Sequence, residues 1–82
     1  MKIFGYDNND EKSDKIIELS QATLNCKKSD IDKIIDFLTE IKKEIENNKV
    51  EDGDHWHYRD YNDSWNEKES DLIVFIDESS NE

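Results

Sequence analysis

Two histidines, His55 and His57, are the residues whose type and spacing could bind a metal ion. Side chains two positions apart on a strand project side by side, and neutral imidazoles are good zinc ligands. A zinc site needs at least three convergent ligands, and the third would have to be Asp54 or Asp60. Because the sequence indicates no definite third ligand, the pattern favours histidines that are exposed or hydrogen-bonded on a sheet face. Metal binding is the weaker alternative, and no cofactor is predicted.

The single cysteine, Cys26, could be a nucleophile with one of these histidines as its base. It alternates with Ala22 and Leu24, which is typical of a buried structural cysteine. The two glycines are too far apart to form a phosphate-binding loop, and the many acids do not form a placed acid–base pair. We therefore predict that the protein is not an enzyme. A lone cysteine also fits a reducing compartment, which indicates the cytoplasm.

The negative charge of the chain is concentrated in its second half. The net charge is −11, with 10 acids against 8 lysines in residues 1–45 and 12 acids against three basic residues in residues 46–82. The two parts therefore carry −2 and −9. Such a field repels nucleic acid and anionic membranes and attracts basic partners, so we expect neither a nucleic acid nor a membrane as partner. The alternative is that this charge serves only solubility.

An aromatic segment with one arginine lies within the acidic half. Tyr, Trp and Arg dominate the binding energy of protein interfaces, and acids around them would steer a basic partner into place. We expect Tyr61 and Trp65 to anchor the contact, whereas Trp56 and Tyr58 can equally pack under a helix. The acids before and after the segment need not lie on the same edge of a sheet. The predicted partner-binding residues are Glu51, Asp52, Asp54, Arg59, Tyr61, Asp63, Trp65, Glu67 and Glu69.

The element that must position these residues is a helix over residues 29–47. Its apolar residues recur with helical spacing and predict one buried stripe, with Leu38 at its centre and Phe37 at its edge. Ser29 stands where an N-cap belongs, with Asp32 three residues later in the manner of a capping box. The pair Asn47-Asn48 can end the helix. The stripe consists of Ile31, Ile34, Ile35, Leu38, Ile41 and Ile45.

Four strands are predicted around this helix, over residues 2–6, 15–26, 55–61 and 72–76. The second needs a β-bulge near Ser20-Gln21 to keep one buried face, and the last is apolar throughout and therefore central in its sheet. The order ββαββ predicts an α+β, two-layer fold with one helix packed on a small, mostly antiparallel four-stranded sheet. We expect a single domain over residues 1–82, with a mobile loop at 7–14 and a frayed tail at 77–82. No apolar run predicts a membrane span or a signal peptide.

Several short motifs of the chain occur in the same order in a known family. They are Ile17-Glu18-Leu19, Leu24-Asn25-Cys26, Ser29-Asp30-Ile31, the run 55–60, Trp65 and the run 70–74. In this order they resemble the small immunity proteins of bacterial polymorphic toxin systems, and most closely the immunity protein family thirty-two. The resemblance covers roughly residues 15–76. It implies a cytoplasmic protein that binds and neutralises one cognate toxin, and it carries over no catalytic residue.

The residues and the resemblance predict a non-enzymatic immunity protein that binds a toxin domain through an acidic, aromatic-containing surface. The charge indicates a basic toxin domain, such as a nuclease, as the partner. One alternative is another acidic inhibitor, such as a phage-encoded nucleic-acid mimic. Another, of a different class, is a small metal-dependent enzyme that uses His55 and His57. The sequence does not predict an oligomeric state.

Overall fold

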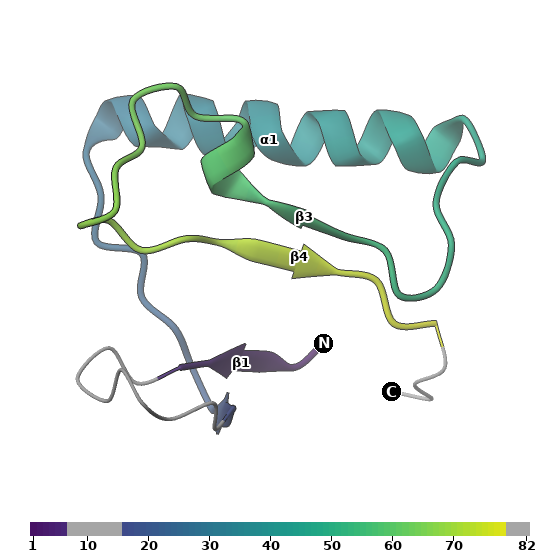
Figure 1. Cartoon of the computed structure of the whole chain (residues 1–82), viewed down its shortest axis with the longest axis horizontal. Coiled ribbons are helices and arrows are strands. Elements are labelled where there is room, and N and C mark those ends of the chain that lie inside the picture. The colour runs from purple at the N-terminus through teal and green to yellow at the C-terminus, as the bar shows by residue number, and fades with distance from the viewer. Residues whose placement is uncertain (7–15, 79–82) are drawn as a thin grey trace.

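One long helix and two small antiparallel sheets make up the computed structural model, which describes residues 1–6 and 16–78 (Figure 1). The predicted α+β class and the order ββαββ are confirmed. The strands do not join into the predicted four-stranded sheet, because in the described part β1 pairs with β2 and β3 with β4. The predicted loop at 7–14, and residues 79–82 of the predicted tail, lie outside the described residues. The elements are β1 (Ile3–Gly5), β2 (Ile17–Leu19), α1 (Lys28–Glu46), β3 (His55–His57), the 3₁₀ turn η1 (Tyr58–Asp60) and β4 (Ile73–Phe75).

Both ends of α1 are closed by specific hydrogen bonds. The N-terminal cap lies two residues before the predicted one, because the Asp30 carboxylate accepts the Lys27 backbone N–H at 2.8 Å. At the other end Asn48 adopts a left-handed conformation with φ of 57°, and its N–H and that of Lys49 return to carbonyls of the last turn. This is a Schellman motif, in which asparagine can replace glycine. No helix in the described residues is long and apolar enough to cross a membrane.

The buried face of α1 differs from the predicted stripe. Phe37 and Ile41 are the buried residues, with 1% and 4% exposure, whereas Leu38 is 46% exposed. The prediction that Leu38 is central and Phe37 peripheral is therefore wrong. The reason is that, among the described residues, β3, β4 and the segment between them lie beneath the helix, and they cover only part of an apolar face this wide. The aromatic ring of Phe37 is met by two tyrosines of the segment that follows β3, Tyr58 and Tyr61.

The β3–β4 hairpin presents one face to α1. Trp56 pairs with Val74, and both pack against the core formed by Phe37, Ile41 and Tyr58. The predicted strand 55–61 stops at His57, where the chain turns into η1, although the Tyr58 N–H still donates to Leu72 at 2.8 Å. In the described residues β4 is paired on one side only, so the prediction of a central strand is also wrong.

The β1–β2 hairpin forms the second sheet, with Ile3 opposite Leu19 and Gly5 opposite Ile17. The predicted long, bulged strand up to residue 26 is wrong, because β1 offers only three residues to pair with. Residues 20–27 instead connect β2 to α1 without regular structure. As a result Cys26 is exposed, not buried as predicted.

Candidate protein-binding surface

The hairpin separates the predicted partner-binding acids into two groups. Glu51, Asp52 and Asp54 lie in the connection from α1 to β3, whereas Asp63, Glu67 and Glu69 lie in the connection from β3 to β4. These two connections meet opposite ends of the antiparallel hairpin (Figure 1). A single partner contact of modest size would therefore reach one group and not the other.

Two acids of the first group hold their own loop. The Asp54 carboxylate accepts the Glu51 N–H, and the Asp52 carboxylate accepts the Glu78 N–H, both at 2.8 Å. Gly53 has φ of 92°, a conformation that side chains disfavour, and its N–H donates to the Ile76 carbonyl at 2.9 Å. These bonds extend the β3–β4 pairing past the strand ends. The carboxylates of Asp52 and Asp54 therefore have local structural roles, whereas Glu51 contributes only its backbone N–H to these bonds.

Tyr61 lies at the end of the hairpin where β3 leads towards β4. Its ring packs against Phe37 and is half exposed to water. Its ring lies 5.2 Å from that of Phe37, between centroids, and the residue is 44% exposed. Its N–H donates to the Tyr58 carbonyl at 2.9 Å, which fixes the backbone. Burial raises the pKa of the Tyr61 hydroxyl, and three carboxylates raise it further, those of Glu44, Glu40 and Asp60. Tyr61 therefore combines a fixed aromatic ring with an acidic surround.

The carboxylates around Tyr61 were not all singled out from the sequence. Glu40 and Glu44 lie on α1, three and seven residues after Phe37, so the three share one helix face. The spacing of Glu40 and Glu44 from Phe37 was the signal available in the sequence. It places these carboxylates near Tyr61 only when Phe37 is known to face the sheet. Glu44 also accepts the indole N–H of Trp56 at 2.7 Å. The acidic surround thus comes from the helix as well as from the loop.

Trp65 closes the loop that follows Tyr61. Its indole N–H donates to the Ser70 carbonyl at 3.1 Å, its backbone N–H donates to Asn62 at 3.0 Å, and its half-buried ring packs against the core. Asn62 is buried, and its amide oxygen accepts from the backbone and hydroxyl of Ser64. Sequence reasoning missed Asn62, although the Asn-Asp-Ser run is typical of such turns. Trp65 therefore stabilises the conformation of this loop, and one side of its ring lies at the surface.

The remaining loop acids differ in their partners. Glu69 accepts from the Asn66 side chain at 3.3 Å, whereas Asp63 and Glu67 are exposed and form no salt bridge with any described residue. Lys33 of α1 reaches over to donate to Ser64 at 2.8 Å, which ties the loop to the helix. Asp63 and Glu67 are thus the carboxylates most available to a partner at this end.

Arg59 is held by an acid that the sequence did not single out. The Asp71 carboxylate accepts the Arg59 backbone N–H at 3.0 Å and lies 3.8 Å from its Nε. The same carboxylate lies 2.7 Å from Nδ1 of His57. Asp71 therefore links both ends of the turn after β3, and half of the Arg59 side chain remains exposed.

The histidines lie on the sheet face that points away from α1. Their ring centroids are 5.5 Å apart, and His55 stacks on Phe75 at 6.4 Å. Asp71 beside His57 supplies a carboxylate, but the described residues contain no group of three His, Cys, Asp or Glu side chains placed to hold a metal. A metal ion at His55 and His57 would therefore find two adjacent imidazoles and one carboxylate, and that carboxylate is already hydrogen-bonded to His57.

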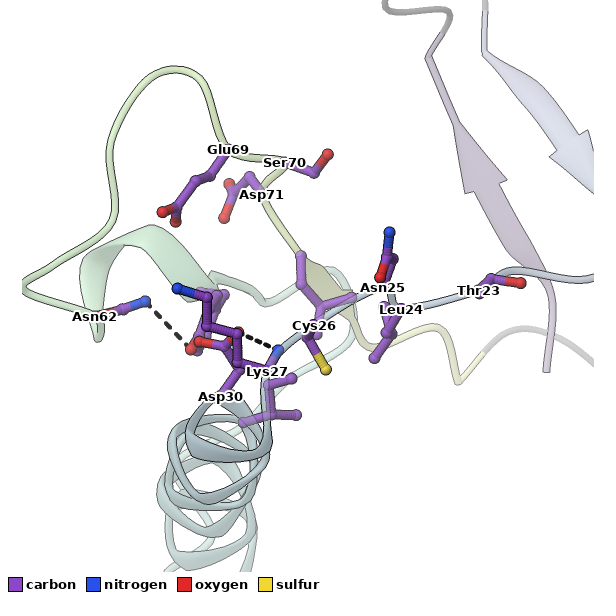
Figure 2. Close-up of a pocket in the computed structure, with 13 residues that line it drawn as sticks. Thr23, Leu24, Asn25, Cys26, Lys27, Asp30, Asn62, Glu69, Ser70 and Asp71 are labelled. Atoms are coloured by element: carbon purple, nitrogen blue, oxygen red, sulfur yellow. Dashed lines mark hydrogen bonds between the residues drawn. The ribbon is translucent and has the colours of Figure 1, made fainter.

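An open pocket of about 610 Å³ lies where residues 23–27, the start of α1 and residues 69–72 meet (Figure 2). Cys26 lines it, but neither histidine does, so the alternative of a nucleophilic Cys26 with a histidine base has no support there. Tyr58 lines its floor, and burial, followed by the nearby Asp30 carboxylate, raises the pKa of that hydroxyl. The side chains of Asp30 and Asn62 already form hydrogen bonds within the protein. The pocket lies between packed segments, and these two polar side chains are not available to a ligand.

Comparison with known proteins gives no match. No family model matches the chain, and no curated protein and no solved structure matches it either.

Proposed function

We propose that this protein is a non-enzymatic immunity protein, which acts in the cytoplasm by binding and neutralising a cognate bacterial toxin domain. Two features of the sequence support the proposal. Residues 46–82 carry a charge of −9, and motifs over residues 15–76 resemble the immunity proteins of polymorphic toxin systems. A basic toxin domain, such as a nuclease, is the partner that this charge fits best.

The observation that carries the proposal is the position of Tyr61 among carboxylates from two elements. Its ring is fixed on Phe37, so little conformational entropy is lost when a partner covers its exposed part. The carboxylates of Glu40 and Asp60 act on the Tyr61 hydroxyl. Glu40 is paired with Lys43 at 3.4 Å on the exposed helix surface, so Asp60 is the one of the two more available to a basic side chain of the partner. Tyrosine is one of the residues that dominate interface hot spots, and acids beside it would steer a basic partner towards it.

The proposed contact, the Tyr61 surface, extends from α1 over the loop that follows η1. Asp63 and Glu67 add exposed charge beyond Tyr61, and Trp65 keeps the loop in shape beneath them. We assign Glu51, Asp52 and Asp54 no direct role, because they lie at the other end of the hairpin and two of them close their own loop. The Tyr61 surface would act by covering the basic active surface of the toxin.

The test is rescue from toxicity. Where the gene immediately upstream encodes a toxin domain, that domain is expressed in a sensitive host together with this protein or a variant of it. We expect the parent protein to protect the host and Tyr61→Ala to lose protection. The matched control is Tyr6→Ala, because Tyr6 is also an exposed tyrosine but lies in the β1–β2 hairpin.

Failure of the parent protein to protect, with purified components that do not bind, would contradict the proposal. The nucleic-acid-mimic alternative makes a different prediction, since it expects binding to a nucleic-acid-binding protein unrelated to the neighbouring gene. Loss of protection in both tyrosine variants, with both still folded, would show that the contact extends to the β1–β2 hairpin.

A further inference from the structure

A half-exposed apolar stripe runs along the flank of α1 that faces away from Tyr61. The opposite flank carries Lys33, Phe37 and Glu44, which contact the segment after β3 and the indole of Trp56. The stripe lies about 100° further round the helix, since Leu38 directly follows Phe37. Its four side chains remain between 46% and 53% exposed, namely Ile31, Ile35, Leu38 and Ile45.

The spacing of the stripe has two-fold symmetry. Ile31, Leu38 and Ile45 lie seven residues apart, so they occupy the same position of successive heptads. Reversing the direction of the helix about Leu38 exchanges Ile31 with Ile45 and leaves Leu38 in place. In an isologous, two-fold pair, Ile31 of each copy would therefore meet Ile45 of the other, and the two Leu38 side chains would meet at the axis.

The polar rim of the stripe is also self-complementary. Lys28, Asp32, Lys42 and Glu46 share the solvent side of the helix beside the stripe. In an antiparallel pair with Leu38 opposite Leu38, Lys28 comes within two positions of Glu46 along the partner helix, and Asp32 within two positions of Lys42. In a parallel pair each residue would face its own like charge. The rim carries no net charge, so it fits a second copy better than a strongly basic partner.

We infer that this stripe is the interface of a homodimer, in which two copies of α1 pack antiparallel around a two-fold axis at Leu38. The 19-residue helix offers a contact about 28 Å long, with the helix axes about 8–10 Å apart. The apolar area is small, so we expect a weak dimer whose population depends on protein concentration. The Tyr61 surface lies on the other flank and stays free, so this inference does not depend on the proposed function.

Salt gives the dimer a signature of its own. Each copy carries a net charge of −11, and the two copies repel each other at long range. Added salt screens that repulsion, so it strengthens the dimer. Binding of a basic partner to the Tyr61 surface responds in the opposite direction, because salt screens an attraction there.

Disulfide trapping tests the geometry in a Cys26→Ser background, which removes the exposed native thiol. Under mild oxidation, Leu38→Cys should cross-link to itself. Ile31→Cys and Ile45→Cys should each stay monomeric when alone, since like positions would be about 21 Å apart, and should cross-link when mixed. Self-linking by all three variants, or by none of them, would overturn the inference.

Sedimentation of the unsubstituted protein provides a second measurement that does not need the cysteine variants to fold. We expect a monomer–dimer equilibrium that salt shifts towards dimer, and Leu38→Lys should weaken it at least tenfold. The control is Phe75→Lys, at an exposed aromatic residue on the far face of β4, which should leave the equilibrium unchanged. A monomer at all concentrations would overturn the inference, and a dimer lost in Phe75→Lys instead would place the interface on the outer face of the β3–β4 sheet.

Discussion

Phe37 of α1 packs edge-on against Tyr58 of η1, with ring centroids 5.5 Å apart and ring planes at 63°. This pair is the main contact between the helix and the segment that follows β3. Both residues are buried, at 1% and 8% exposure, and the edge-to-face geometry is the one that aromatic rings prefer. The contact explains why Phe37, and not the aliphatic stripe beside it, determines how α1 sits on the hairpin.

Replacement of Phe37 should therefore destabilise the fold far more than replacement of its neighbour Leu38. Phe37→Ala removes a fully buried ring and should lower the free energy of unfolding by about 3–5 kcal/mol. Leu38→Ala should cost less than about 1 kcal/mol, because half of that side chain is already in water. Urea unfolding of both variants, at a protein concentration too low for association, measures the difference. Equal losses in the two variants would show that α1 is rotated from the described position.

Alkaline pH should also destabilise the protein through its tyrosines. Burial raises the pKa of Tyr58 and of Tyr61 in the folded state, with nearby carboxylates adding to the shift. A tyrosine with a raised pKa contributes its full stabilisation below its unfolded value of about 10, and loses it as the pH rises through the folded value. The free energy of unfolding should therefore fall above pH about 10.

Lysines titrate in the same range, so the informative measurement is a comparison between variants. Urea unfolding at a series of alkaline pH values should show a shallower decline for Tyr61→Phe than for the parent protein. Glu40→Gln should have a smaller effect in the same direction, because it removes one of the carboxylates that raise the pKa of Tyr61. A decline of unchanged steepness in Tyr61→Phe would contradict this account.

No tightly bound transition metal is expected, and this remains a prediction. His55→Ala should leave the fold intact, because His55 is exposed on the outer face of β3, where its ring contacts the rings of His57 and Phe75. The measurement is the zinc content of protein washed with chelator, together with the thermal unfolding of the variant. One zinc per chain that disappears in His55→Ala would establish a metal site instead.

The sequence predicted the positions of the helix and strands better than it predicted which of their faces are buried. The spacing of the isoleucines predicted α1, whereas packing of Trp56 and Tyr58 under the helix was only one of two alternatives, and the structure shows that both lie in or against the core. The sequence could not decide which part of a wide apolar face is covered, because that depends on how many strands lie beneath the helix. The N-terminal cap was misplaced because Ser29 is the better capping residue by type, whereas the Asp30 carboxylate reaches back to Lys27.

The candidate surface was predictable only in part for the same reason. Tyr61 and the loop acids are evident from residue types, but the separation of Glu51 from Glu67 follows from the antiparallel hairpin. The carboxylates of Glu40 and Glu44 join the surface through the rotation of α1, which periodicity left open. Long-range packing, not local pattern, brings these residues together.

The association and dissociation rates of toxin binding should distinguish the role of the charged residues from that of the aromatic ones. Steering charges act mainly on the association rate and are screened by salt, whereas a buried anchor acts mainly on dissociation. Asp63→Asn with Glu67→Gln should slow association and weaken its dependence on salt. Tyr61→Ala should speed dissociation, by about 2 kcal/mol or more if the ring is a hot spot. Trp65→Ala should do the same, but together with a loss of fold stability, because the indole closes its loop on Ser70.

The matched control for charge is Glu51→Gln with Glu78→Gln, which neutralises two exposed acids at the other end of the hairpin. It changes the net charge by the same amount, so it isolates the position of the charge from its total. Association measured by surface plasmon resonance at two salt concentrations should be nearly unchanged in this control. If both pairs slow association equally, the acidity acts as a diffuse field and does not mark the Tyr61 surface. If neither pair slows it and Tyr61→Ala dissociates like the parent protein, the interface lies elsewhere on the molecule.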